Sequence, residues 1–417
     1  DLRLAVLRVD EARAAYGIQR AEQQPGLGAS VDGARARIPA DLNLTGQPLV
    51  GNQFQVGLGL ASWELDFWGR VRSLKGAALE TYLASDEARR AVTLALIHQV
   101  AQSYLALRET DERLALARRA EASRQESLRI FRRRVELGAT SKLELTLVEL
   151  LWQQAHALVT QLELTREQQA HALTLLVGRP VALQPASTPL SAAWIVAPLP
   201  PGLPSALLVQ RPDILAAEHG LLAGDAQIGA ARAAFFPRIA LTGAFGTASA
   251  ELDGLFQPGS TAWNWAPSIS LPLLDGGRRA AALELARVRR EQALVRYEQT
   301  VRSAFRDVSD ALAARRNLAE QVQTVNATLA VQTERARLAK LRYDSGAARY
   351  LEVLDAERDL LALAQQAVQV RRAQLSAEVS LYAAIGGGSL SFPFAGAPEP
   401  VPGQPIVSNV STAGSTP

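Results

Sequence analysis

The 417-residue chain contains no cysteine and no methionine, and only 6% of its residues are aromatic. The absence of cysteine excludes disulfides, thiolate metal sites and cysteine nucleophiles. Because methionine is missing even at position 1, we expect a processed or trimmed product, as removal of a signal peptide would give. Alanine, leucine and arginine are abundant instead, which is typical of long helices packed through small side chains. The composition therefore predicts a mostly helical fold.

Neither a surplus of one charge nor a long apolar run is present. The 44 Lys and Arg residues nearly balance the 41 Asp and Glu residues, leaving a net charge of +3. Without a basic block, nucleic acid is not an expected partner. The apolar stretch Val92–Ile97 is bounded by Arg90 and His98, and no other window has the length of a transmembrane helix. A bilayer crossing by this chain would need a closed β-barrel.

Motifs for metal, cofactor or catalytic chemistry are also missing. None of the four histidines has the spacing of a metal ligand, and His219 is expected at a surface. Gly386–Gly388 lacks the preceding strand and the following Lys-Ser/Thr of a phosphate loop. No nucleophile elbow or pair of carboxylates suggests hydrolysis. We therefore expect no metal site, no cofactor and no enzymatic activity.

An internal repeat organises the chain. Arg70 matches Arg278 and Gly138 matches Gly346, both at a spacing of 208 residues (278 − 70 = 208). Each half is predicted to contain a helix, two strands, a very long helix, a glycine turn and a returning helix. The predicted units are a first repeat at 1–180, a proline-rich linker at 181–211, a second repeat at 212–388, and an extended or disordered tail at 389–417.

Four segments alternate apolar with small or polar residues, as half-buried strands do. They are expected at about 26–36, 54–65, 238–248 and 262–273. Each is roughly ten residues long, which suits a tilted strand that crosses a bilayer. Trp263, Trp265 and Phe256 would then lie at the membrane interface. A soluble half-buried sheet would give the same alternation, so this alternative stays open.

Four strands are too few to close a barrel around a polar lumen. Three copies of the chain would supply about twelve strands and would remove every sheet edge. The strand count therefore leads to the hypothesis of a homotrimer with one shared barrel.

The segments 70–137 and 278–345 contain no proline, and each is expected to form one helix of about 100 Å. Returning helices are predicted at about 141–177 and 350–385. Apolar residues at alternating spacings of four and three predict a coiled-coil seam in the second long helix. The seam residues are Val301, Phe305, Val308, Leu312, Ala319, Val322, Leu329 and Ala336. A structural coiled-coil protein, or an adaptor that contacts a channel through its helical hairpin, would also fit these helices.

Five longer segments carry a more specific pattern. They are WELDFWGRVR at Trp63–Arg72, GLPSALLVQRPDILAAE at Gly202–Glu218, IGAARAAFFPRIALTGAFG at Ile228–Gly246, LPLLDGGRR at Leu271–Arg279, and LRYDSGAARYLEVLDAER at Leu341–Arg358. Together they resemble the TolC-like outer-membrane efflux proteins, and among these the multidrug OprM/NodT-type branch. The resemblance covers nearly the whole chain.

This resemblance implies a trimer with a twelve-stranded barrel in the outer membrane of a Gram-negative bacterium, continuous with a helical tunnel in the periplasm. It also implies a periplasmic adaptor and an inner-membrane pump as partners. The linker from Val181 to Pro204 and the C-terminal residues would form an equatorial belt. Family members often carry an acylated cysteine before the position of Asp1, but no residue of this chain can be that acceptor. The exported compound, and which pump and adaptor are served, are not indicated.

The resemblance also assigns functional residues at the tips of the two helical hairpins. The turns would close the tunnel and meet the adaptor through Gly138, Ala139, Thr140, Ser141, Gly346, Ala347 and Ala348. Leu351, Asp355 and Arg358 match the constriction residues of the family and share one helix face. Three copies of Asp355 around a threefold axis would favour cations. An ordinary ion pair between Asp355 and Arg358 is the alternative interpretation.

Overall fold

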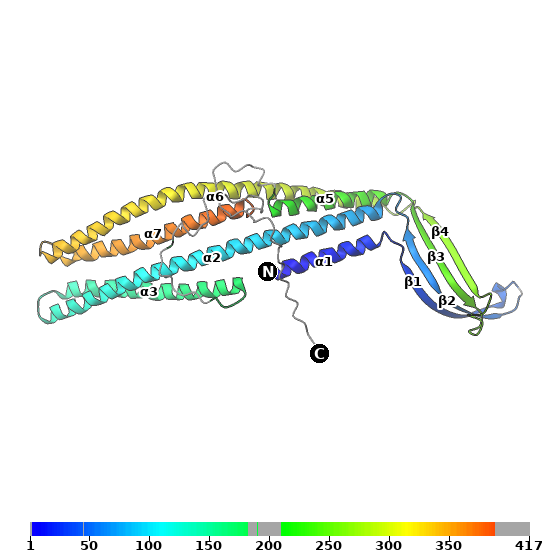
Figure 1. The fold of residues 1–417 in the computed structure, drawn as a ribbon, viewed down its shortest axis with the longest axis horizontal. Coiled ribbons are helices and arrows are strands. Elements are labelled where there is room, and N and C mark those ends of the chain that lie inside the picture. Colours follow the sequence, from blue (N-terminus) through cyan, green and yellow to red (C-terminus); the bar gives the residue numbers. More distant parts are fainter. Residues whose placement is uncertain (1, 45, 182–189, 191–209, 388–417) are drawn as a thin grey trace, which may run out of the picture.

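The computed structural model describes residues 2–44, 46–181, 190 and 210–387. The molecule is elongated, with one sheet at one end and two long helical hairpins extending from it (Figure 1). The first half contains α1 (Leu2–Ala21), β1 (Leu27–Ile38), the short η1 (Ala40–Leu42), β2 (Leu49–Glu64), α2 (Arg70–Glu136) and α3 (Lys142–Val177). The second half contains α5 (Pro212–Ala233), β3 (Arg238–Ser249), β4 (Thr261–Ser270), α6 (Arg278–Asp344) and α7 (Tyr350–Ala384). The predicted linker and tail lie almost entirely outside the described residues.

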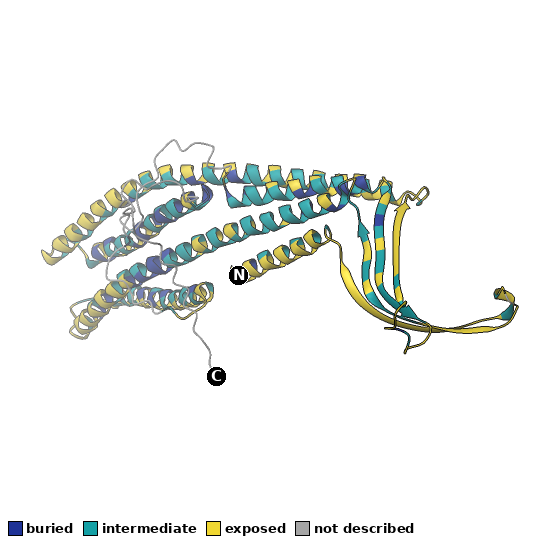
Figure 2. Cartoon of the chain, turned by 45° about the vertical axis from the view of Figure 1, so that its right-hand side comes forward, coloured by how far each residue is buried: buried dark blue, intermediate teal, exposed yellow. Residues whose placement is uncertain are grey.

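The four strands form one antiparallel sheet in the order β1-β2-β3-β4. Within the described residues, β1 and β4 each pair with a single strand, so each leaves one edge of the sheet unpaired. Figure 2 shows β1 exposed along its length, in agreement with the exposure of each of its residues. The two outer edges of the sheet therefore have no partner among the described residues of the chain.

Two predicted strand limits are wrong. β2 begins at Leu49 rather than near 54, because its first residues continue the ladder with β1 as far as the pair Ile38 and Leu49. The polar run Asn52-Gln53 hides this extension, since it breaks the alternation. β4 ends at Ser270 rather than near 273, because Pro272 has no N–H to continue a ladder.

The two strands at the centre of the sheet approach each other closely at paired glycines. Gly57 of β2 lies opposite Gly246 of β3. A Cβ atom added to Gly246 would lie 2.1 Å from the carbonyl oxygen of Val56 and 2.5 Å from the Cα of Gly57. Only glycine fits such a contact, because the obstacle is backbone that cannot rotate away.

Each long helix follows a strand after a short connecting segment, and an aspartate of that segment caps the helix. Asp66 accepts hydrogen bonds from the backbone N–H groups of Val71 and Arg72, at 3.0 and 2.8 Å. Asp275 plays the same part for α6, accepting from the N–H of Gly277 and the N–H of Arg279, at 3.1 and 3.2 Å. A carboxylate at this position satisfies free N–H groups and favours the positive end of the helix dipole. These caps fix where the sheet ends and the helical part begins.

α2 and α6 contain 67 residues each, so each extends about 100 Å at 1.5 Å per residue. α1 and α3 follow one another along α2, while α5 and α7 follow one another between α2 and α6 and contact both (Figure 1). None of the described helices combines the length and apolar character that a membrane span requires.

The seam of α6 differs in part from its prediction. Val308, Val322 and Leu329 pack in the apolar clusters as expected. Phe305 and Leu312, however, are 51% and 49% exposed. The residues that α6 buries are instead Ala286, Ala304, Ala311 and Val325. Small side chains allow α6 to approach α5 and α7 closely. The prediction relied on large apolar residues, and several of these lie on the neighbouring, exposed face of α6.

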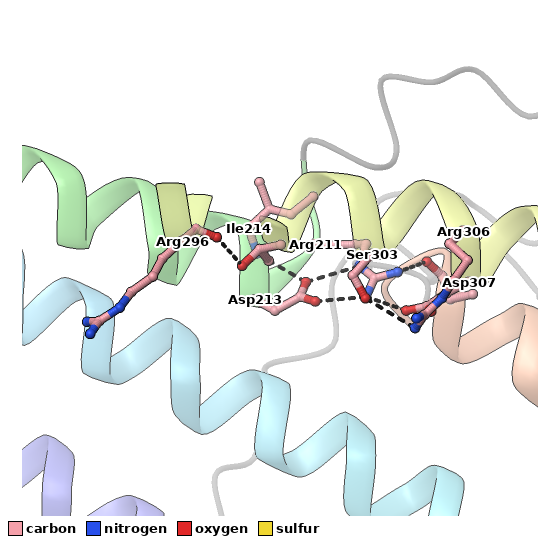
Figure 3. Close-up of polar contacts among 9 residues, drawn as sticks. Arg211, Asp213, Ile214, Arg296, Ser303, Arg306 and Asp307 are labelled. Carbon is pink, nitrogen blue, oxygen red and sulfur yellow. Dashed lines mark hydrogen bonds and ion pairs between the residues drawn. The ribbon is translucent and has the colours of Figure 1, made fainter. Parts of the chain in front are cut away.

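The start of α5, the middle of α6 and the end of α7 meet around one buried arginine (Figure 3). Arg211 donates to the carbonyl oxygen of Ala384 at the end of α7, at 2.7 Å, and to the carboxylate of Asp213 at 2.7 and 3.0 Å. It also lies 3.5 Å from Asp307 of α6. Burial alone would lower the pKa of Arg211, but the two carboxylates raise it overall. We refer to these four residues as the Arg211 joint.

The close approach of β2 and β3 predicts that Gly246→Ala destabilises the protein by about 1–3 kcal/mol, because an extra methyl group must displace backbone. Gly28→Ala is the matched control, since nothing lies within 4 Å of the Cβ it would add. Thermal unfolding followed by circular dichroism would compare the two. Equal melting temperatures would contradict the proposed contact.

The Arg211 joint predicts that Arg211→Met destabilises the protein by about 1–3 kcal/mol, because the end of α7 loses its donor and the carboxylates lose their cation. Arg306→Met is the control: Arg306 also pairs with Asp307, at 2.8 Å, but its side chain is 69% exposed. This exposed ion pair should contribute nothing measurable to the free energy of unfolding. Denaturant unfolding of both variants would test this, and similar midpoints would argue against the joint.

Candidate functional site

The turns of the two helical hairpins lie together at the end of the molecule farthest from the sheet (Figure 1). Gly138 and Gly346 hold φ angles of 71° and 76°, which glycine adopts without strain. In each turn the next N–H closes back onto the long helix, from Ala139 to Arg134 and from Ala347 to Arg342, both at 2.8 Å. The predicted tip residues lie in or directly beside these turns: Gly138, Ala139, Thr140, Ser141, Gly346, Ala347 and Ala348.

The two turns differ in how the returning helix starts. Ser141 caps α3 by accepting a hydrogen bond from the N–H of Glu144 at 3.2 Å, and Thr140 bonds to the carboxylate of Glu144. At the matching position α7 has Arg349, whose side chain makes no cap. Leu137 and Leu143, on either side of the first turn, are 66% and 70% exposed. The first turn is therefore better anchored, and exposed leucines lie on both sides of it.

The predicted constriction residues lie in the first turns of α7 and share one face, as their spacing requires. Leu351 is 47% exposed, so its side chain is available at the surface. Asp355 lies 3.2 Å from Arg358, and the Asp355 side chain is still 43% exposed. The ion pair that was the alternative interpretation is therefore present in the single chain, and it leaves the carboxylate open to solvent.

A chain of charges continues from this pair to α6. Arg358 also contacts Asp359 at 3.1 Å, and Asp359 accepts from Arg335 at 2.9 Å. The hydrogen bond from Arg335, followed by that from Arg358, lowers the pKa of Asp359. Arg342 and Glu352 form a second link between α6 and α7 at 2.9 Å. These exposed ion pairs connect α6 with α7, and the two arginines favour the ionised form of Asp359.

Sequence reasoning missed an aromatic contact between the two hairpins. The ring of Tyr350, at the start of α7, lies 4.5 Å from Phe131 of α2 and 4.8 Å from Tyr343 of α6. Arg134 of α2 lies over the rings of Phe131 and Tyr343 and bonds to the hydroxyl of Tyr343. Aromatic residues near both turns were visible in the sequence, but the two halves give no signal of which rings meet.

The predicted interface aromatics lie toward the end of the sheet away from the helices. Trp263 and Trp265 are 74% and 67% exposed on β4, and Phe256, at 76%, belongs to the turn that joins β3 and β4. Trp263 pairs with Phe245 of β3, which is 64% exposed. These rings form an exposed aromatic group at one level of the sheet.

A second aromatic group, which the sequence analysis did not single out, lies where strands meet helices. Trp68 stacks on Phe236 at 4.8 Å and donates its indole N–H to the carbonyl oxygen of Pro237 at 2.8 Å. Phe67 and Phe235 beside them are 67% and 41% exposed. The segments DFWGR and AFFPR, each at a strand–helix boundary, were the available signal. The sheet therefore has exposed aromatic residues near both of its ends.

The histidines do not form a metal site in the described part of the chain, where no group of three potential ligands occurs. His219, predicted at a surface, is only 26% exposed in its side chain, because α5 packs on α2 and brings it 2.6 Å from Glu80. His156 contacts Glu121 in the same way, at 2.7 Å. Both histidines join pairs of helices.

Comparison with known proteins identifies close similarity. The model of the family described as outer membrane efflux protein matches residues 1–179 and 203–387. The chain is 44% identical over 389 residues to the outer membrane protein OprJ of Pseudomonas aeruginosa, covering 93% of this chain and 81% of that protein. It is 41% identical over 389 residues to the solvent efflux pump outer membrane protein SrpC of Pseudomonas putida, covering 93% and 82%.

Solved structures are similar over the same length. A membrane protein from Pseudomonas aeruginosa superposes with a TM-score of 0.88 at 43% identity, over 93% of this chain and 87% of that one. CusC superposes with a TM-score of 0.85 at 39% identity, over 93% and 89%. The open state of the Neisseria gonorrhoeae MtrE outer membrane channel gives 0.84 at 39% identity, over 93% and 86%.

Proposed function

The chain belongs to the outer membrane efflux protein family, and from this premise we propose that three copies of it form the exit duct of a tripartite efflux pump. It is an outer-membrane efflux channel, and the proteins it matches are transport proteins rather than enzymes. A periplasmic adaptor and an inner-membrane pump would deliver small molecules to it. The observation that carries the assembly is the incomplete sheet of the single chain.

A trimer resolves the two open edges of that sheet. β1 and β4 each lack a second partner among the described residues, and an unpaired edge inside lipid leaves backbone groups without hydrogen bonds. Three sheets of four strands give a barrel of twelve (3 × 4 = 12), in which β4 of one copy pairs with β1 of the next. The outer-membrane location makes closure of the barrel a physical requirement.

The helical part also offers faces for a neighbouring copy. Leu4 and Leu7 of α1 are 54% and 55% exposed, and Phe305 and Leu312 of α6 are about half exposed. α1 and α6 lie at opposite sides of the protomer (Figure 1). Their apolar faces would meet in a ring of three copies, which accounts for the large side chains of α6 that the single chain leaves uncovered. The twofold repeat of the sequence would give the helical tunnel its regular wall.

The two aromatic groups support a position for the barrel in the membrane. Aromatic side chains gather at both faces of a bilayer in such barrels. Trp263, Trp265 and Phe256 would lie at the outer interface, in contact with outer-membrane lipid. Trp68 and Phe236 would lie at the periplasmic interface, where the strands give way to the helices.

The tips would then lie at the periplasmic end. In a trimer, Leu351, Asp355 and Arg358 of three α7 helices would form an iris gate with a ring of carboxylates. The exposed turns, with Leu137 and Leu143 beside the first, are the surface that an adaptor would contact. The tips of the two hairpins would thus both close the tunnel and bind the adaptor.

The assembly predicts a mass of about three times the 44.7 kDa of one chain in detergent. Light scattering on the purified protein would measure it, and planar bilayers would detect single-channel conductance in the same sample. A stable monomer that retains its sheet would refute the shared barrel. A monodisperse, detergent-free rod would favour a coiled-coil or adaptor role instead.

The proposed gate predicts that Asp355→Ala lowers the preference of the channel for cations and raises its leak, because the carboxylate ring and its hold on Arg358 are lost. The reversal potential in a salt gradient measures the preference. As a control, Glu163→Ala on α3 removes a carboxylate from an exposed ion pair with Arg118. This change should leave the preference of the channel for cations unaltered. Identical selectivity in all three proteins would contradict the gate assignment.

A further inference from the structure

Two arginines interrupt the apolar face of the sheet near its end away from the helices. In β1, Arg35 and Arg37 share a face with Leu27 and Val31, because even numbers of residues separate all four. We call Arg35 and Arg37 the basic pair. We propose that the basic pair binds the phosphate groups of lipid in the outer leaflet of the outer membrane. The inference rests on the barrel proposed above.

The register of the sheet identifies the face that would meet lipid. Residues directly opposite each other on neighbouring strands point to the same side of a sheet. The row of Val31 therefore continues across the sheet into apolar and aromatic residues: Phe54, Val56, Leu58 and Leu60 of β2, Phe245 of β3, and Trp263 and Trp265 of β4. The other face carries small and polar residues such as Ser30, Gln55 and Asn264. A barrel with a polar lumen turns its apolar face to lipid, so the basic pair faces lipid too.

The height of the basic pair fits the outer edge of the bilayer. A charged side chain on the lipid face is most unfavourable at the midplane and least so near an interface. Arg37 follows Leu27 by ten residues (37 − 27 = 10), which is about 34 Å along a strand and, at a tilt of roughly 40°, about 26 Å in height. The apolar band of such barrels is about 25 Å tall. Arg37 therefore reaches the headgroups, and the long side chain of Arg35 can extend to the same level.

The neighbouring strand changes character at the same register. Phe54 of β2 lies opposite Gly33, whereas Asn52, the next residue of β2 on this face, lies opposite Arg35. Two adjacent strands thus pass from apolar to polar side chains at one level. Beyond it, Val50 opposite Arg37 is the one apolar residue of these two rows. The coincidence of the two changes marks the outer limit of the lipid-facing band independently of the strand length.

The two guanidinium groups are available for an anion. Every residue of β1 is exposed, and within the described residues neither Arg35 nor Arg37 has a hydrogen bond or an ion pair. A guanidinium is planar and donates paired hydrogen bonds that match the oxygens of a phosphate. No other residue on this face of the four strands is charged. Lipid phosphates lie at the depth that the basic pair reaches, so charge and position agree on the partner.

The second repeat lacks the basic pair. Pro25 matches Pro237 at a spacing of 212 residues (237 − 25 = 212), which places the neutral Thr247 and Ser249 of β3 at the positions of the two arginines. β1 is an edge strand, and in the proposed barrel it pairs with β4 of the next copy. Each trimer would therefore hold three lipid sites, one at every seam between two copies.

Native mass spectrometry of the assembled protein in detergent tests the proposal, with lipid A and fully dephosphorylated lipid A as probes. The unmodified protein should bind lipid A more tightly. Arg35→Gln combined with Arg37→Gln should weaken lipid A binding by about 25-fold, since a basic side chain near an anionic membrane surface contributes about fivefold. The same variant should bind the dephosphorylated lipid as the unmodified protein does.

The control variant removes two arginines from the helical part. Arg3 and Arg8 of α1 are exposed and have no ion pair within the described part of the chain. Arg3→Gln combined with Arg8→Gln changes the net charge equally and should leave both lipid affinities unchanged. An unmodified protein that binds both lipids equally would overturn the inference. Unchanged lipid A binding after loss of the basic pair would also overturn it.

A second copy and free phosphate are the competing occupants. Glu251 and Asp253 lie in the turn between β3 and β4, beyond the last residue of β3. If that turn of the next copy bound the basic pair, Glu251→Gln with Asp253→Asn would destabilise the trimer as much as loss of the arginines does. Inorganic phosphate should not displace lipid A, because it has no acyl chains to meet the apolar face. Either contrary result would replace the lipid with the other partner.

The mass of the protein in the same spectra separates this inference from the channel proposal. A trimer whose lipid binding is independent of Arg35 and Arg37 refutes the lipid site and leaves the exit duct intact. A protein that is only monomeric refutes the shared barrel, and the lipid site with it. Arg35→Lys combined with Arg37→Lys keeps both charges, so it should bind lipid A more tightly than the glutamine variant. Equal binding by these two variants would exclude a role for the charge of the basic pair.

Discussion

Close packing of small side chains along two very long helices is the interaction on which the rest of the structure depends. Ala117 and Ala155, at the contact of α2 with α3, and Ala304 and Ala356, along α6 and α7, are at most 1% exposed. Alanine lets neighbouring helices approach over their whole length and favours helix intrinsically. Because α2 contacts α1, α3, α5 and α7, its length determines how far the sheet at one end lies from the hairpin tips at the other.

Much of the fold could be predicted from the sequence because its elements are long and regular. Absence of proline and a fixed repeat placed the ends of both long helices within about one residue of their observed limits. The errors arose where a neighbouring strand or helix determines the limit of an element or the face that it buries. β2 extends to Leu49 because β1 continues beside it, and the buried face of α6 contains Ala304 and Ala311 because α5 and α7 come close. Local pattern carries no information about such partners.

The candidate site was predictable to a similar degree. Helix periodicity placed Leu351, Asp355 and Arg358 on one face, and glycine placed the turns, since both follow from neighbouring residues in the chain. Their roles came from resemblance and stay proposals. The role of Tyr350 became visible only from its contacts with Ser127 and Phe131 of α2, which precede it by more than two hundred positions. Pairings across such separations need the folded molecule.

The Arg211 joint also bears on how the chain reaches its final form. The hydrogen bond from Arg211 to Ala384 connects residues 173 positions apart. The end of α7 therefore packs against a part of the chain that is synthesised much earlier. During synthesis from the N-terminus to the C-terminus, the side of α2 that includes Leu105 and Phe131 stays exposed to solvent until α7 has been made. A nascent chain that exposes this apolar surface until α7 is made is prone to aggregation, so truncation before α7 should be more damaging than its distance from the sheet suggests.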